Sequence, residues 1–329
     1  MTQSASFGDL ARAQFLRAAN TATRQKLSDA TAEVVSGQHA DVAAAHRGQT
    51  GQIALIDATL TRISAYQRNG AQVTATLSAV DLALGAIHTL VWRKDVEITS
   101  QIAQGDDQGL RQSATLGQGD LDAVLSQLAT TSGGRYVFAG TAVSNVPVLS
   151  STAILTRIRD TIAAEPGKTP QAAVDDLFSA TDGAGAYLGG CVVSGVAVAD
   201  GRSTGNPAIA ADPGLTAMLK GLTLAALAGD PDMTAAERRV VMGDAARNMA
   251  TGTAGITTLR ARVGAEAAGV EGAMTSNDTM TANLTMARNN LVSVDPYEAA
   301  TALTEAEARM NKLYALTARL SRLSLTDYL

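Results

Sequence analysis

Apolar residues recur at alternating intervals of three and four positions along most of this chain, which is the spacing of an amphipathic α-helix. The most regular stretch covers residues 256–294, and a second covers residues 53–98. Each such helix carries an apolar stripe that another helix has to cover. The sequence therefore predicts a mainly α fold, in which long antiparallel helices from the N- and C-terminal halves pair into a bundle or coiled-coil rod.

The ladder in the N-terminal half predicts a helix of roughly 50 residues, on the order of 75 Å at 1.5 Å per residue. Its members are Ile53, Ile56, Leu60, Ile63, Gln67, Gly70, Thr74, Leu77, Asp81, Leu84, His88, Val91, Asp95 and Ile98. Gly105 and the two aspartates after it end this helix, and a second helix over residues 110–128 is expected to fold back along it.

The ladder in the C-terminal half consists of Ile256, Leu259, Val263, Glu266, Val270, Ala273, Asn277, Met280, Leu284, Ala287, Leu291 and Val294. Its phase is lost at Asp295-Pro296, where we predict a helix boundary because proline does not continue a helix. Further helix starts are predicted at Asp212-Pro213 and at Thr234–Glu237, where a capping residue precedes the first turn.

Weaker seams lie near both ends of the chain, and each would stay bare unless another helix covered it. We expect the two seams to match each other and to form the assembly surface. The N-terminal assembly seam comprises Leu16, Thr23, Leu27 and Val34. The C-terminal assembly seam comprises Leu303, Met310, Leu313, Leu320, Leu323, Leu325, Tyr328 and Leu329.

Residues 141–213 differ from the rest because most of the prolines fall there. Their pattern predicts a small mixed α/β insert at the tip of the rod, with short helices near 154–162 and 170–178 and strands at 191–193 and 196–198. The chain then divides into an N-terminal assembly helix, a long helical hairpin, the variable insert, returning long helices and a C-terminal assembly helix. These segments are 1–50, 51–140, 141–213, 214–294 and 295–329.

Charge and composition narrow the choice of partners. The net charge is −5, no basic field invites nucleic acid, and no Lys/Arg cluster follows an amphipathic face onto a membrane, so neither nucleic acid nor a membrane surface is an expected partner. No apolar run approaches the ~18–20 residues of a membrane span, so no membrane insertion is expected. The N-terminus lacks a cleavable leader, so we expect a protein that stays in the cytosol or leaves without a cleaved signal peptide.

No catalytic constellation can be proposed from spacing, so we expect no enzyme, cofactor or metal site. His88 lacks an acidic or Cys partner at ligand spacing and is expected to pack or face solvent. A metal site of His39, His46 and Asp41 is disfavoured by the spacing of seven between the histidines and by their alanine-rich surroundings. Cys191 is the single cysteine, which excludes an internal disulfide, and it is expected to be a small buried residue in a strand.

Four polar residues lie on the apolar ladders, and two explanations remain open for them. They either select the register between helices or lie at a wet edge of the ladder. These residues are Asp81, Asp95, Glu266 and Asn277.

Three stretches resemble the flagellin superfamily, and most closely its hook–filament junction proteins. The run Gly134-Arg135-Tyr136-Val137-Phe138-Ala139-Gly140 is similar to the family motif after the first helical hairpin, with Gly134, Tyr136, Phe138 and Gly140 as its key positions. Residues 27–37 and 295–329 resemble the family's N-terminal Ser-Gly stretch and C-terminal helix. The segments Ser6–Leu10 and Asp41–Ala45 depart from the usual pattern.

The resemblance implies a structural component of the bacterial flagellum. Such a protein would be exported without a cleaved signal peptide by type III export, aided by an export chaperone, and would be extracellular. It would assemble with copies of itself in a ring, between a neighbouring hook-associated protein and flagellin, as its terminal helices fold. A filament flagellin is the alternative in the same class, and a cytosolic helical signalling rod is the alternative in another class.

Overall fold

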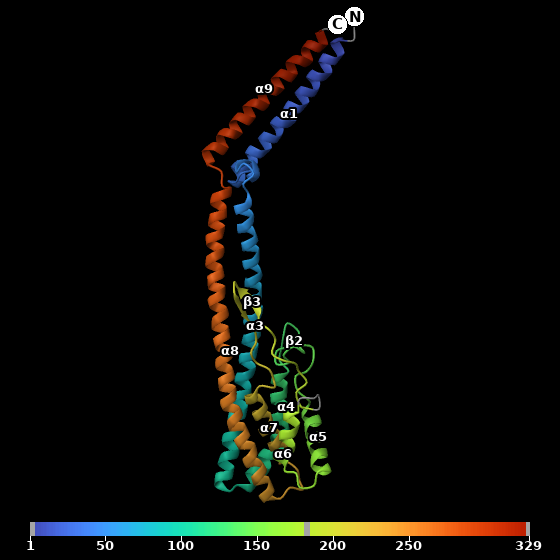
Figure 1. The fold of residues 1–329 in the computed structure, drawn as a ribbon, viewed down its shortest axis with the longest axis vertical. Helices are drawn as coiled ribbons and strands as arrows, with labels where there is room; N and C mark the ends of the chain where they lie inside the picture. Colours follow the sequence, from blue (N-terminus) through green and yellow to red (C-terminus); the bar gives the residue numbers. More distant parts are fainter. Residues whose placement is uncertain (1–3, 181–184, 327–329) are drawn as a thin grey trace. The chain divides into compact units, whose positions relative to one another are not determined.

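The structure is a computed structural model that describes residues 4–180 and 185–326, with side chains for residues 11, 14–180 and 185–319. The chain divides into two compact units, residues 1–63 with 278–329 and residues 64–277. The described part is mainly α, with long helices from both halves of the chain (Figure 1). The predicted mainly α fold with a small mixed insert is thereby confirmed.

The helices, in chain order, are α1 (Ser4–Ser36), α2 (Val42–Ala45), α3 (Gly51–Gln104), α4 (Asp107–Leu128), α5 (Ser151–Ala164), α6 (Pro170–Ser179), α7 (Pro213–Leu227), α8 (Ala235–Val292) and α9 (Pro296–Thr326). Two short antiparallel hairpins accompany them. They are formed by β1 (Thr131–Ser132) with β2 (Arg135–Tyr136), and by β3 (Val196–Ala199) with β4 (Arg202–Thr204).

Helix ends follow the predicted signals. Helix α3 stops just before Gly105, whose φ of 71° suits glycine, and the Asp106 carboxylate accepts the Gly109 amide at the start of α4. At the start of α8, the Thr234 hydroxyl accepts the Glu237 amide, while the Glu237 carboxylate accepts the Thr234 amide. The predicted capping box is confirmed.

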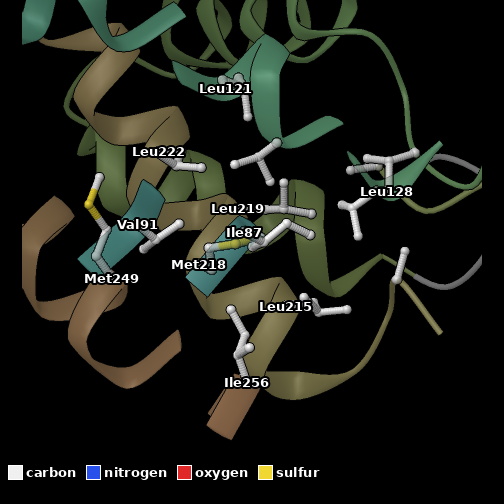
Figure 2. Close-up of a cluster of buried hydrophobic side chains, with 14 of the residues drawn as sticks. Ile87, Val91, Leu121, Leu128, Leu215, Met218, Leu219, Leu222, Met249 and Ile256 are labelled. Atoms are coloured by element: carbon white, nitrogen blue, oxygen red, sulfur yellow. The ribbon is translucent and has the colours of Figure 1, made fainter. Parts of the chain in front are cut away.

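Helix α7 is the centre of the unit formed by residues 64–277. Most of its side chains are buried, including Leu215, Met218, Leu219 and Leu222, and they face α3, α4 and α8 (Figure 2). Apolar residues of α5 and α6 belong to the same buried cluster, so these short helices share its core. The division of the chain into five segments remains a prediction.

Glycines let the backbones around α7 approach closely. A β-carbon added at Gly252 of α8 would lie 2.7 Å from the backbone nitrogen of Met218, and one at Gly117 of α4 would lie 2.7 Å from that of Ala226. No side chain fits at either place. Glycine at these positions therefore allows close helix packing.

The buried face of α3 is wider than the ladder predicted from the sequence. Val73, Val80 and Ile87 are buried, whereas the ladder member Thr74 is exposed. A straight α-helix drifts by about 20° per heptad relative to a strict seam, and α3 packs against more than one helix, so neighbouring positions become covered. The prediction that Thr74 lies on the covered face was wrong for this reason.

Two of the polar ladder residues hold the β3–β4 hairpin. The Asn277 side chain donates to the Val198 carbonyl at 2.8 Å, and the Thr204 hydroxyl donates to the Glu266 carboxylate. Asn277 is buried, so its amide needs such a hydrogen-bond partner within the protein. These two positions tie a hairpin to α8 instead of setting the register between two helices.

Asp81 does join two helices, since the Arg260 guanidinium of α8 donates to its carboxylate at 2.8 Å. This contact supports the register hypothesis for Asp81. Asp95 is half-buried, and burial raises its pKa above the ordinary value.

Cys191 is exposed, so the prediction of a buried residue in a strand was wrong. The segment 191–193 forms no strand, because its neighbourhood bonds to a turn instead. The Thr141 amide donates to the Cys191 carbonyl, and the Gly190 amide donates to the Ala139 carbonyl, both at 2.9 Å. The strand predicted at 196–198 is present as β3.

One 18-residue window of α3 reaches a mean hydropathy of 1.4, so α3 is long and apolar enough to cross a membrane, contrary to the expectation from the sequence. A helix buried in a protein core meets the same criterion. In the structure 33% of that window is buried, and eight apolar side chains of α3 belong to the core of residues 64–277, namely Val73, Leu77, Val80, Ala83, Leu84, Ile87, Val91 and Ile98. Leu82, Trp92 and Val96 of the same helix are exposed.

A polar network joins α3 to α4. The Lys94 ammonium is nearly buried and lies 2.9 Å from the Asp120 carboxylate and 3.3 Å from Glu97. The Ser113 hydroxyl donates to Glu97 at 2.6 Å. This hydrogen bond, with the help of the Lys94 charge, lowers the pKa of Glu97 below its ordinary value of 4.5.

The lowered pKa of Glu97 predicts how the free energy of unfolding changes with pH. The ionised carboxylate stabilises the folded state above pH 4.5, and this contribution is lost as the pH falls through the lower folded pKa. We therefore expect Ser113→Ala to destabilise the protein near neutral pH, by an amount that shrinks between about pH 7 and about pH 3 in urea titrations. Ser126→Ala, at an exposed site on α4, is the control. A pH-independent cost of Ser113→Ala would contradict the assignment.

Candidate assembly interface

Helix α9 begins where the sequence predicted. The Asp295 carboxylate accepts the amides of Tyr297 and Glu298 at 2.7 Å and 3.2 Å, and Pro296 occupies the first helical position. From there α9 runs beside α1 and antiparallel to it (Figure 1). The prediction that the seams of these two helices form the assembly surface remains a prediction.

The face between α1 and α9 is thin. Its most buried side chains are Ala30, Ala299, Ala306 and Met310. At ~25 cal/mol per Å², alanine methyl groups contribute little to the free energy of folding. The terminal pair therefore has a small core of its own.

The predicted seam residues differ in burial and in how far the structure describes them. Leu16, Thr23, Leu27, Leu303 and Leu313 are half-buried, Met310 is buried, and Val34 is 44% exposed. The side chains of Leu320, Leu323 and Leu325 lie outside the described part, although their backbone belongs to α9. Tyr328 and Leu329 lie outside the described residues altogether.

Large apolar side chains point outward from the same two helices. Val35 is 82% exposed, Tyr297 81% and Phe15 73%, while Tyr314 and Leu316 are about half exposed. Sequence reasoning missed these residues because the ladders mark the face that is covered within the chain. The residue type alone could have indicated these positions in the sequence, since exposed aromatic residues are enriched in protein interfaces.

Backbone hydrogen bonds tie the base of the terminal pair together. The Val294 amide donates to the Gly37 carbonyl at 3.1 Å, and the His39 amide donates to the Val292 carbonyl at 2.9 Å. Gly37 has a φ of 68°, which suits glycine at the end of α1. The breaks after α1 and after α8 therefore lie opposite each other and form one joint.

Two of the three histidines, His39 and His46, take part in this joint. A ring nitrogen of His46 lies 2.6 Å from the Leu291 carbonyl oxygen, and His39 lies 3.6 Å from Glu33. Within residues 4–180 and 185–326, no group of three or more His, Cys, Asp or Glu side chains is placed to hold a metal ion.

The residues of the Gly134–Gly140 motif form a structural corner within the unit of residues 64–277. Phe138 is fully buried, Tyr136 is half-buried, and Gly134 and Gly140 have φ values of 76° and 59°. A β-carbon at Gly140 would lie 2.4 Å from the carbonyl oxygens of two neighbouring residues. The motif thus shapes a turn rather than an assembly surface.

The thin core of the terminal pair predicts its response to protease. Segments with few buried contacts open at a small free energy, so trace protease should remove residues near 1–40 and 295–329 before it cuts the core. A fragment of about residues 50–290 should survive, as seen by mass spectrometry. Equal protection of the terminal helices and the core would contradict this prediction.

Residues 247–329 match the family model of the bacterial flagellin C-terminal helical region. This range includes all of α8 after Ala246 and all of α9. No curated protein matches the chain. The match shows that this C-terminal part of the chain is similar to the helical region of flagellin, and it supports a structural component of the flagellum.

Proposed function

We propose that this chain is a hook-associated adaptor of the bacterial flagellum, which joins a hook-side protein to filament flagellin. The family match over residues 247–329 is the observation that carries the flagellar assignment. The choice of an adaptor rests on the closing sequence Leu323-Ser324-Leu325-Thr326-Asp327-Tyr328-Leu329, which resembles the ending of the hook–filament junction protein, hook-associated protein 3.

Assembly proceeds by coupled folding of the terminal helices. Outside the assembly, α1 and α9 have a small shared core, and their exposed side chains Phe15, Val35 and Tyr297 lack cover. Neighbouring subunits bury these side chains and stabilise both helices, because binding to the folded form shifts the folding equilibrium. Export before this step, with a chaperone on the unfolded ends, delivers the subunit outside the cell without a cleaved signal peptide.

A filament flagellin is the second candidate, since the same family match supports it. It would use the same terminal helices but would polymerise into many copies. The two candidates differ in what happens to flagellin when the gene is deleted.

The deciding experiment is deletion of the gene in a motile host, followed by electron microscopy of the cells and a blot of the medium for flagellin. The adaptor predicts hooks without filaments and flagellin monomer lost to the medium. Bare hooks without exported flagellin would identify the filament subunit instead. Normal filaments would contradict both candidates. Complementation with the intact gene is the control.

A further inference from the structure

Apart from Asp9 in α1, the two terminal helices carry their charges in separate halves. In residues 10–26 and 309–326 every charged residue is Lys or Arg, and in residues 27–36 and 296–308 every charged residue is Asp or Glu. Helices α1 and α9 run antiparallel, so like halves lie side by side (Figure 1). We call residues 10–26 with 309–326 the basic half and residues 27–36 with 296–308 the acidic half.

The described charged side chains of both halves are exposed or half-buried. In the basic half they are Arg17, Arg24, Lys26, Arg309, Lys312 and Arg319, and in the acidic half they are Asp29, Glu33, Glu298, Glu305 and Glu307. These charges are therefore available to a partner.

Helix stability does not explain this order on α1. Acidic residues are favourable near the N-terminus of a helix and basic residues near the C-terminus, by about 0.3–1 kcal/mol each. Helix α1 lacks this order, since no acidic residue lies in its first turn, no basic residue lies in its last turn, and Glu33 lies near its C-terminal end. Its charge order thus costs stability locally, which favours a role in contacts with another molecule.

Contacts within the chain leave most of these charges without an opposite charge. Among the described side chains of the terminal pair, the ion pairs are Arg309 with Glu305 at 3.2 Å on one helix, and Glu33 with His39 at 3.6 Å. Neither crosses from α1 to α9.

Each half also presents large apolar side chains. Tyr297 and Val35 are 81% and 82% exposed in the acidic half, and Phe15 and Leu316 are 73% and 51% exposed in the basic half. Apolar anchors surrounded by charges of one sign are typical of surfaces that select a partner by charge complementarity.

We propose that the acidic half of one subunit docks on the basic half of a second copy of this chain. The two copies lie parallel and are displaced by roughly 20 Å along the helix axis, since the centres of the halves are about 15 residues apart on α9. This arrangement leaves a free half at either end of a pair, so further copies can add. The proposal deepens the proposed function by naming the contact through which copies assemble.

The test is self-association of the full chain measured by sedimentation velocity, with a reductant present because Cys191 is exposed. Salt is raised from about 20 mM to about 500 mM, which shortens the screening length from about 20 Å to about 4 Å. We expect oligomers at low salt and an association at least about tenfold weaker at high salt. A purely apolar contact would not weaken with salt.

Two charge-reversal variants identify the surfaces. Glu298→Lys with Glu307→Lys weakens the acidic half, and Lys312→Glu with Arg319→Glu weakens the basic half; all four side chains are exposed. Each variant alone should associate at least about tenfold more weakly than the wild type at low salt. A mixture of the two should associate more strongly than either variant alone, because one intact acidic half then meets one intact basic half.

The matched control is Asp122→Lys with Glu271→Lys, which changes the net charge by the same amount at exposed sites on α4 and α8. It should associate like the wild type, and circular dichroism should show equal helix content in all variants. The proposal would be overturned if the wild-type chain stayed monomeric at low salt. It would also be overturned if both charge-reversal variants formed the same oligomers as the wild type. The gene deletion tests the flagellar function separately, so either result can fail without the other.

Discussion

Replacing Gly252 by leucine should destabilise the unit of residues 64–277 by about 3 kcal/mol or more, because an added side chain meets backbone rather than a flexible neighbour. A β-carbon there would lie within 2.8 Å of the Met218 nitrogen, α-carbon and β-carbon. Helix α7 would have to move away from α8, which would open the core around Leu215 and Leu222 (Figure 2). Urea denaturation followed by circular dichroism measures the change in the free energy of unfolding.

Gly264 offers a matched control on the same helix. A β-carbon at Gly264 would meet nothing within 4 Å, and the residue is exposed. Gly264→Leu should therefore stabilise the protein by about 0.5–1 kcal/mol, through higher helix propensity alone. Equal effects of the two substitutions would show that α7 and α8 do not pack as closely as the structure has them.

Replacing Arg238 by methionine should be the second most damaging change, at about 2–4 kcal/mol. Arg238 is 4% exposed, and its guanidinium donates to the carbonyls of Ala228 and Asp230 at 2.8 Å and 2.9 Å, just beyond the end of α7. These bonds satisfy carbonyls at a helix C-terminus, where a positive charge is also favourable. Methionine retains much of the apolar stem and removes both donors.

Arg239 is the neighbouring control, since it is about half exposed and contacts Asp107 on the surface. Arg239→Met should change the free energy of unfolding by less than about 1 kcal/mol, as surface ion pairs usually do. If the two substitutions cost the same in a thermal or urea titration, the guanidinium of Arg238 would not be the cap of α7.

Helix identity and helix ends could be predicted from the sequence because their causes are local. Asp106, Thr234 and Asp295 cap the helices that follow them, and proline or glycine marks the boundaries. The paired terminal helices also followed from two matching ladders. These features depend on residues within a few positions of one another.

The contacts of the insert could not be predicted, since they depend on the tertiary fold. Asn277 bonds to Val198 across 79 positions of sequence, and nothing in the ladder distinguishes that amide from one at a wet edge. Cys191 was placed in a strand by its apolar neighbours, whereas the turn at Ala139–Thr141 takes its backbone bonds. For the candidate interface, periodicity gave the covered face but not the exposed side chains Phe15 and Tyr297, which follow no ladder.

The central position of α7 has a consequence for the timing of synthesis. Helices α3 and α4 bury their apolar faces against α7, and α7 in turn needs the part of α8 that contains Met249 and Ile256. A ribosome adds about 5–20 residues per second, so roughly 5–30 seconds separate completion of α4 from the emergence of this part of α8. Throughout that interval the growing chain exposes the apolar faces of α3 and α4. A chaperone that binds the chain then has to prevent only the completion of this core, and it does not have to unfold a finished protein.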